Sequence, residues 1–176
     1  MRKNRLKIGL FVAVVAVVLC VQIAYAQDHD PSQLSSVIEV CFNVDEHCFP
    51  AQSIIFSASQ TATLHIGGGA GAGKASIDDI LLVRAPDSFS PKLFLLLAQG
   101  THMQDATINI KIFSGEGGLT DFMQLTLDPV MITNLSIQTL DGKLPREELA
   151  LNFSNICISV QDGEKTCWNV ETNSKK

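Results

Sequence analysis

Apolar and polar side chains alternate with a period of two through most of the chain, and this pattern predicts β-strands. In Ser53–Ile66 the apolar side chains share one parity, while hydroxyl side chains and His65 occupy the other, as in a half-buried strand. The same alternation predicts strands over Thr107–Phe113 and Phe122–Asp128. The composition of Ser76–Arg84, rich in isoleucine, leucine and valine, predicts a further strand. The predicted fold class is therefore mainly β.

The segment Glu148–Val160 changes its parity part-way along. Its apolar positions are first Leu149, Leu151 and Phe153, and then Ile156, Ile158 and Val160. One extra residue in the strand would produce this change, so we expect a β-bulge near Ser154 or Asn155. Such a bulge would bend the strand around a barrel or a sandwich.

One segment departs from the period of two and predicts a short α-helix. Ser90 is a suitable N-cap, Pro91 fits the first helical position, and Gly100 follows an apolar run that ends at Ala98. The run is apolar on nearly all sides, so the helix is expected to press against the sheet or against a neighbouring subunit.

The glycine-rich stretch Gly67–Lys74 has the G-x-x-x-x-G-K spacing of a phosphate-binding loop, starting at Gly68. That motif requires Ser or Thr next, to bind magnesium, and a following helix; here Ala75 follows, and then a predicted strand. We therefore interpret the stretch as a pliable loop between two strands, and we expect no cofactor. The candidate contact residues of this loop are Gly67, Gly68, Gly69, Gly71, Gly73 and Lys74.

The first 26 residues have the pattern of a secretory signal peptide. A positively charged start precedes an apolar run over Ile8–Ile23, and cleavage is expected after Ala26. A retained membrane anchor and lipidation at Cys20 are the alternatives, but the apolar run is short and Leu19 is larger than the residue that precedes a lipidated cysteine. The pattern predicts export to the periplasm or the outside medium, with no stable membrane insertion after cleavage.

Removal of the signal leaves residues 27–176, which are enough for one domain with a single core. Four of the 13 Lys and Arg residues lie in the signal and none of the 18 Asp and Glu residues do, so the mature chain has a formal charge of −9. A chain of this charge repels phosphate backbones, and we expect no nucleic-acid partner.

Four cysteines remain after cleavage, and an even number in an exported chain indicates disulfides with three possible connectivities. Cys41 and Cys48 flank one turn-forming stretch and Cys157 and Cys167 flank another, so proximity across two hairpins favours these local pairs. Chain entropy alone would favour a longer link, at nearly 5 kcal/mol against about 2–3 kcal/mol for each local pair. A metal site that includes His47 is the alternative, but the closely spaced cysteine pairs typical of zinc are absent from the sequence.

The sequence contains no G-x-S-x-G, H-E-x-x-H or C-x-x-C motif, so the commonest hydrolase, metalloprotease and thiol-redox signatures are missing. His65 and His102 could approach each other but are too few to define a metal or catalytic site. The acidic pairs are Asp78 with Asp79 and Glu147 with Glu148. Adjacent side chains on a strand point to opposite faces, so neither pair is expected to form a catalytic dyad. We predict no catalytic residues and no enzyme.

The order of several motifs resembles the Hcp family, the tube proteins of bacterial type VI secretion. The glycine-rich stretch Leu64–Asp79 is similar to a loop and following strand of that family, and the matching order continues from Ser53 to Lys176. The other matching motifs are Ser90–Leu93, Gly100–His102, Ala106–Ile108, Leu125–Val130, Leu151–Phe153 and Cys167–Val170 with Asn173 and Lys175.

This resemblance implies a β-barrel of two antiparallel sheets with one short flanking α-helix. It also implies a homo-hexameric ring that stacks into a hollow tube and carries small secreted effector proteins, with a mechanical rather than a catalytic role. Two features depart from the family: the signal peptide, and the cysteine-bearing loop Cys41–Pro50 in place of a charged loop. They suggest a relative released by the general export route, and they bear on whether rings stack.

Three kinds of protein therefore remain open. The mature chain is a ring-forming structural component, a monomeric secreted binding module that uses Gly67–Lys74 and the first loop, or an exported enzyme with an unrecognised site. The mass of the oxidised protein in solution separates the first from the second.

Overall fold

The computed structural model of the chain describes residues 36–62, 72–114, 118–139 and 141–176. Within these ranges the chain is mostly strand, with a single α-helix and one short 3-10 turn. The elements are β1 (Ser36–Phe42), η1 (Val44–Glu46), β2 (His47–Ala51), β3 (Ser53–Ile55), β4 (Ala58–Ala62), β5 (Ala72–Ile77), β6 (Ile80–Arg84), α2 (Ser90–Ala98), β7 (Ala106–Ser114), β8 (Gly118–Gln138), β9 (Arg146–Val160), β10 (Thr166–Asn169) and β11 (Ser174–Lys175). The predicted signal Met1–Ala26, its cleavage point and Cys20 lie outside the described residues.

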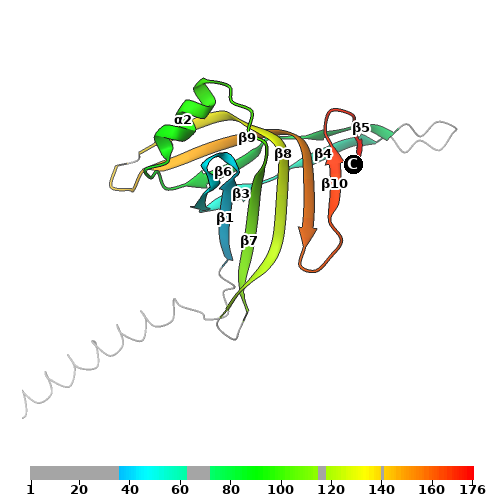
Figure 1. Cartoon of the computed structure of the whole chain (residues 1–176), viewed down its shortest axis with the longest axis horizontal. Coiled ribbons are helices and arrows are strands. Elements are labelled where there is room, and N and C mark those ends of the chain that lie inside the picture. The colour runs from blue at the N-terminus through cyan, green and yellow to red at the C-terminus, as the bar shows by residue number, and fades with distance from the viewer. Residues whose placement is uncertain (1–35, 63–71, 115–117, 140) are drawn as a thin grey trace, which may run out of the picture. The chain divides into compact units, whose positions relative to one another are not determined.

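The larger sheet has nine strands and closes on itself as a barrel (Figure 1). Antiparallel pairing runs from β2 through β1, β7, β8 and β9, while β6 pairs with the first half of β9 and also with β3. Only Gln52 separates β2 from β3, and its backbone N–H donates to the carbonyl of Val83 in β6 at 2.7 Å. A second antiparallel sheet contains only β4 and β5. The expected mainly β fold of two antiparallel sheets and one flanking helix is confirmed, with sheets of very unequal size.

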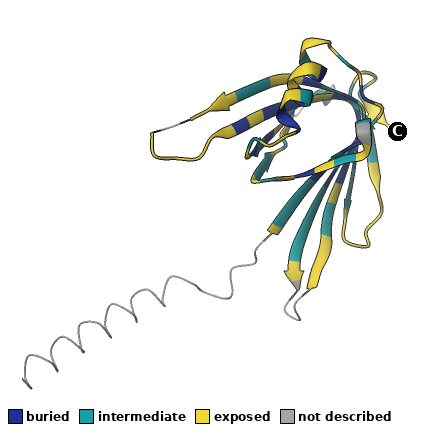
Figure 2. Ribbon diagram, turned by 60° about the vertical axis from the view of Figure 1, so that its left-hand side comes forward, coloured by how far each residue is buried: buried dark blue, intermediate teal, exposed yellow. Residues whose placement is uncertain are grey.

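The core fills the barrel interior and is contributed by strands from the whole chain (Figure 2). The most completely buried apolar side chains include Val40, Phe42, Phe49, Ile80, Leu82, Leu93, Met103, Ile108, Leu127, Val130, Leu149 and Leu151. Because these residues belong to seven different elements and to the bridging residue Met103, burial of apolar surface couples distant parts of the sequence into one core.

Helix α2 has the predicted extent and packs on the sheet through one face. Leu93 and Leu96 are buried beside β8, whereas the side chains of Phe94 and Leu95 remain 59% and 45% exposed. Gly100 has a φ of +60° directly after the helix, a left-handed conformation that glycine adopts without a steric penalty. The helix was expected to press against the sheet or against a neighbouring subunit. The sheet covers one face of the helix, and the opposite face is exposed on the surface of the subunit.

The start of α2 differs from the prediction in one detail. Ser90 is the first helical residue rather than the N-cap, and Phe89 occupies the cap position without a side-chain cap. The hydroxyl of Ser90 instead accepts the backbone N–H of Asp87 at 3.1 Å and donates to Glu147. The reason is tertiary, because a buried carboxylate from β9 competes for the hydroxyl.

The predicted single strand Ser53–Ile66 is wrong, because the described part is divided into β3 and β4. The segment that pairs with it is also divided, into β5 and β6. The residues at the two interruptions are hydrogen-bonded to each other. The Ser57 hydroxyl donates to Asp78 Oδ2 at 2.5 Å, and the Asp78 N–H donates to the Ser57 carbonyl at 3.1 Å. At this corner both segments leave the barrel, so the side chains of residues 58–61 in β4 are exposed rather than half-buried.

The predicted strands over Thr107–Phe113 and Phe122–Asp128 are confirmed as parts of β7 and of the much longer β8. The bulge expected near Ser154 or Asn155 is wrong, because the β8–β9 register is the same before and after that point. Strand β8 changes its inward parity opposite the same place, from Leu127 to Val130, so both strands bend together without an extra residue. The register shift lies instead between Ile132 and Asn134 of β8.

No helix within the described ranges is long and apolar enough to cross a membrane.

Candidate assembly site

Strands β4 and β5 form an arm that runs away from the barrel (Figure 1). They pair antiparallel from Ala58 opposite Ile77 to Ala62 opposite Ala72. This pairing agrees with the interpretation of the glycine-rich stretch as a connection between two strands. Gly67, Gly68, Gly69 and Gly71 lie outside the described residues, whereas Gly73 and Lys74 belong to β5 and the Lys74 side chain is exposed.

The strand geometry at Lys74 does not match a phosphate-binding loop. In that loop the lysine opens a helix whose backbone N–H groups bind phosphate. Lys74 lies within β5, where its neighbour Ala75 pairs with Gln60 of β4. The residues therefore fit a β-ribbon rather than the start of a helix.

The base of the arm contacts the C-terminal hairpin, which we define as β10, β11 and the turn between them. The Ala75 N–H donates to Asn173 Oδ1 at 3.2 Å, and Val170 lines a shallow hollow together with Lys74, Ser76 and Ile77. The two segments are about a hundred residues apart in sequence, so the sequence pattern gave no sign of this contact.

A chain of amide hydrogen bonds fixes the C-terminal hairpin to the bend of the barrel. Asn169 donates to Asn155 Oδ1 at 2.7 Å, and Asn155 Nδ2 donates to the carbonyl and to Oδ1 of Asp128, each at 2.7 Å. Asn169 Oδ1 also accepts the N–H and the hydroxyl of Thr172 within the turn. Buried amide groups that are satisfied in this way hold a single arrangement.

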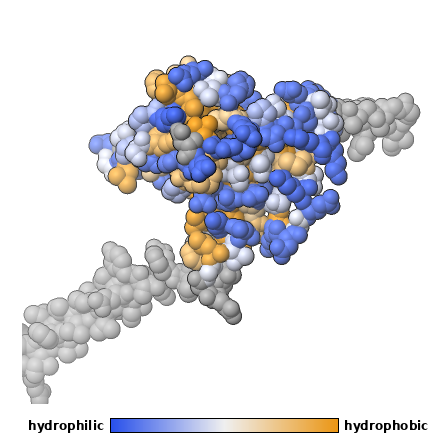
Figure 3. Space-filling view, viewed as in Figure 1, coloured by the Kyte–Doolittle hydropathy of each residue, from blue (hydrophilic) through white to orange (hydrophobic). Residues whose placement is uncertain are grey.

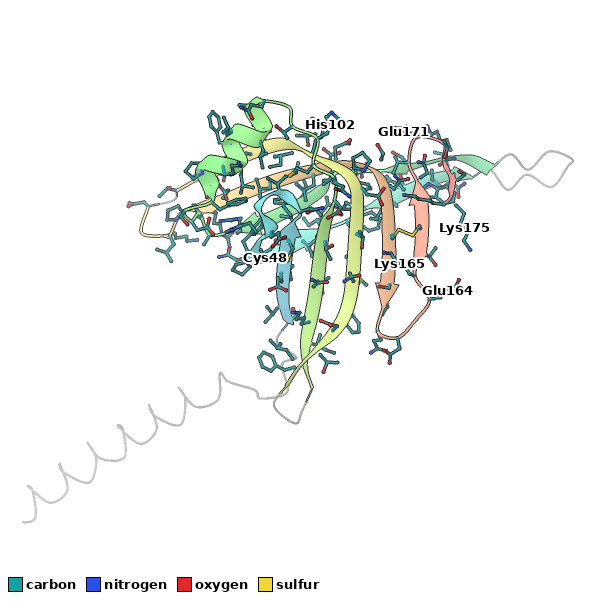
Figure 4. The ribbon with its side chains drawn as sticks, in the orientation of Figure 1. Cys48, His102, Glu164, Lys165, Glu171 and Lys175 are labelled. Carbon is teal, nitrogen blue, oxygen red and sulfur yellow. A yellow bond between two sulfur atoms is a disulfide. The ribbon has the colours of Figure 1, made fainter. Side chains whose placement is uncertain are left out.

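Both disulfides join residues that face each other directly across two antiparallel strands. Cys41 of β1 is bonded to Cys48 of β2, and Cys157 of β9 is bonded to Cys167 of β10. These are the two local pairs that proximity across a hairpin favours. Cys48 is exposed at the barrel edge (Figure 4), whereas Cys157 is only 5% exposed.

A buried ion cluster connects β6, β9 and the start of α2. The side chains of Arg84 and Glu147 are 1% and 0% exposed, and Arg84 Nε lies 3.1 Å from Glu147 Oε2. Ser90 donates to the same carboxylate oxygen at 3.1 Å, and the Arg84 guanidinium lies 4.2 Å from the ring centroid of Phe49. Glu147 Oε1 and Arg84 Nη1 have no hydrogen-bond partner among the described residues, so this pair is held by charge and packing.

The sequence contained a usable sign of this ion cluster. Arg84 shares its parity with the apolar residues Ile80 and Leu82, and Glu147 shares its parity with Leu149 and Leu151. A charged residue on an inward parity predicts a buried partner of opposite charge. Our treatment of Glu147 and Glu148 as an acidic pair missed the ion pair of Glu147 with Arg84. The two glutamates do point to opposite faces of the strand, because Glu147 is buried and Glu148 is exposed.

Asp87 connects the ion cluster to the surface. Burial raises the pKa of its carboxyl, but the Phe89 N–H, donating at 2.8 Å, and the close Arg84 guanidinium lower it by more. The Arg84 contact is an ion pair at Nη2 rather than an aligned hydrogen bond. The net pKa lies below the usual aspartate value, so Asp87 stabilises the fold in its charged form.

Replacing Asp87 with Asn should reduce the free energy of unfolding at pH 7 by less than about 1 kcal/mol, because the side chain is 42% exposed. A lowered folded-state pKa means that the stabilisation is complete above the unfolded-state pKa and disappears as the pH falls through the folded-state pKa. Urea unfolding at neutral and at acid pH should therefore show the two proteins converging in acid. A difference that persists unchanged in acid would assign the effect to geometry rather than to charge.

The remaining sequence candidates do not gather into a catalytic or metal site within the described ranges. His102 is exposed and His65 lies outside them. Asp79 accepts hydrogen bonds from the Thr133 hydroxyl at 2.6 Å and from Asn152 Nδ2 at 2.7 Å. His47 stacks on Phe89 with 3.7 Å between ring centroids. No group of three or more metal-ligating side chains occurs in the part of the chain that the structure describes.

Several apolar side chains remain uncovered on the surface of the subunit. Ile55 of β3 lies opposite Leu81 of β6, and their side chains are 56% and 46% exposed beside a hollow of about 150 Å³. Phe113 and Leu119 form an exposed pair at the far end of β7 and β8. Figure 3 shows hydrophobic residues gathered over α2 and near the lower ends of β1 and β7. Contiguous exposed apolar patches are typical of contact surfaces between proteins, whereas single exposed apolar side chains are common on any protein surface.

Comparison with models of known protein families identifies the family of this chain. The family described as "Type VI secretion system effector, Hcp" matches residues 47–159, which is more than half of the chain. The chain belongs to the Hcp family. The matched region of this Hcp-family chain begins at β2 and ends within β9, so it contains the barrel closure, the arm, the ion cluster and α2.

Solved Hcp structures have the same fold as this Hcp-family chain. Hcp1 from Salmonella typhimurium is 18% identical over 81% of this chain and 99% of its own, with a TM-score of 0.64. A structure described as a type six secretion system protein is 18% identical over 81% of this chain and 100% of its own, with a TM-score of 0.69. A chain of the 6-fold symmetrised anti-feeding prophage baseplate is 14% identical over 77% of this chain and 93% of its own, with a TM-score of 0.50. No curated protein matches the chain by sequence.

Proposed function

We propose that the mature protein, residues 27–176, is an exported, non-enzymatic Hcp that assembles into a homo-hexameric ring. The family match over residues 47–159, together with an Hcp barrel over 81% of the chain, carries this proposal. Cleavage after Ala26 would release a single domain into the periplasm or the outside medium. The ring would serve as a structural tube component or as a carrier of small secreted effector proteins.

The surface of the subunit supports a cyclic assembly. A ring requires two different surfaces on each subunit, because every interface joins the front of one copy to the back of the next. The arm with Gly73 and Lys74 is one candidate surface, and the exposed pair Ile55 and Leu81 is another. The baseplate structure described as 6-fold symmetrised contains a chain with this fold, which supports six subunits. The acidic charge of the mature chain disfavours nucleic acid as cargo.

The alternative is a monomeric secreted binding module with the same barrel. One observation favours it: the two disulfides and the closed core lie within a single subunit, so the barrel has its own covalent staples and interior. In that case the arm and the loop between β1 and β2 would form the contact surface for another partner.

The absolute mass of the purified, oxidised mature protein tests the ring. We expect a mass of six subunits at micromolar concentration, measured by light scattering during size-exclusion chromatography. When a small secreted protein is added as cargo, the mass of the ring should rise by a whole-number multiple of the mass of that protein. A strictly monomeric protein at high micromolar concentration would contradict the ring and favour the binding module.

A further inference from the structure

The Cys157–Cys167 disulfide is the covalent link of a small hairpin that hydrogen bonds of Asn169 and the packing of Trp168 also hold to the barrel. Strand β10 has four residues and β11 has two, and β11 pairs only with β10 in the larger sheet. Hairpins of this size are marginal in water without further packing. The bond lies at the centre of the β9–β10 register, one residue before Trp168, whose half-buried side chain packs against the core.

The C-terminal hairpin in turn holds the base of the arm. Asn173 has a φ of +53° in the turn before β11, and this left-handed conformation directs its Oδ1 to the Ala75 N–H. Apart from Ile77, which packs against the core where the arm meets the barrel, the described side chains of the arm are small or polar and mostly exposed, so packing contributes little to the orientation of the rest of the arm. Contacts at the base of the arm therefore have a large share in deciding where it points.

We propose that the Cys157–Cys167 disulfide is a redox lock on the assembly arm. When the bond is formed, β10 is held against β9, and Asn173 holds the arm in the orientation that ring assembly uses. When the two cysteines are thiols, the hairpin loosens and the arm is released while the barrel stays folded. The inference rests on the proposed ring function.

The redox step is an ordinary thiol–disulfide exchange. Two thiols, Cys157 and Cys167, lose two electrons and two protons to an external disulfide, which leaves as two thiols. An oxidising compartment outside the cytoplasm supplies such disulfides, whereas reducing cytoplasm does not. The precursor would therefore be unable to assemble before export, and oxidation after export would permit it.

The first disulfide provides a matched control. The double variants Cys157→Ser/Cys167→Ser and Cys41→Ser/Cys48→Ser each remove one cross-strand bond, with sequence separations of 10 and 7 residues, so their losses of loop entropy are similar. Only Cys157→Ser/Cys167→Ser frees the hairpin that contacts the arm. We expect this variant to lose the hexameric mass and Cys41→Ser/Cys48→Ser to keep it.

Asn173 tests the contact itself. Asn173→Gly keeps the left-handed turn but removes the acceptor, and Asn173→Asp keeps an oxygen at the same position. We expect the Ala75 amide hydrogen to exchange about tenfold faster in Asn173→Gly, and within about twofold of wild type in Asn173→Asp. The same increase is expected in Cys157→Ser/Cys167→Ser, and Trp168, the only tryptophan, reports the loosened hairpin by its fluorescence.

The outcomes separate the lock from the ring. If both disulfide variants lose the hexamer equally, the disulfides act through overall stability and the lock is wrong. If Ala75 exchange is unchanged in Asn173→Gly and in Cys157→Ser/Cys167→Ser, the hairpin does not hold the arm. If the oxidised wild type is monomeric while Ala75 exchange still responds to both changes, the ring fails but the contact between hairpin and arm stands.

Discussion

Replacing Glu147 with Leu should lower the free energy of unfolding by about 3 kcal/mol, the lower end of the usual cost of breaking a buried ion pair. The change leaves the guanidinium of Arg84, which is 1% exposed, without its buried partner. Asp87 keeps one ion pair to Arg84, which is why the expected loss is not larger. Urea unfolding followed by circular dichroism measures the difference.

Two further variants identify the cause of that loss. Glu148→Leu changes the exposed neighbour and should alter the free energy of unfolding by less than about 0.5 kcal/mol. Arg84→Met combined with Glu147→Leu removes both charges and should restore most of the lost stability, since apolar replacements of buried pairs are often neutral. If the double variant is as unstable as Glu147→Leu, the loss comes from packing or from the Ser90 contact rather than from an unpaired charge.

Replacing Leu93 with Ala should lower the free energy of unfolding by about 2–5 kcal/mol, because its side chain is fully buried between α2 and the barrel and its removal leaves a cavity. Leu95→Ala is the matched control on the same helix, with 45% of its side chain exposed, and should change stability by less than about 1 kcal/mol. Denaturation midpoints at constant slope provide the comparison. Equal losses in the two variants would contradict a dominant role for the burial of Leu93, because Leu→Ala does not lower helix propensity at either position.

Features with a local cause were predictable from the sequence. Pro91 and Gly100 predicted the extent of α2, because helix ends depend on neighbouring residues, although Phe89 rather than the predicted Ser90 is the N-cap. The two cysteine pairs followed from their positions on either side of short turns. The period of two correctly placed β7 and β9, since each has one face on the core.

Features with a distant cause were not predictable in this way. An alternating pattern does not say which strand is the partner. The corner between Ser57 and Asp78, where β4 and β5 leave the barrel, was therefore not predictable from the pattern. The bend in β9 was read as a bulge because the matching change in β8 lies in another segment. The contact of Asn173 with Ala75 and the charge pair of Arg84 with Glu147 likewise join residues brought together only by the completed fold.

The closure of the barrel through Gln52 has a consequence for the time at which the chain can fold. Strand β3, just beyond Gln52, pairs with β6, and β6 pairs with β9 near the end of the chain, while β1 pairs with β7. Almost the whole polypeptide must be synthesised before the ring of strands can close, and pairings of such long range form slowly, in milliseconds to seconds. A chain of this topology therefore stays unfolded until most of it has been synthesised, which is compatible with the proposed export before folding.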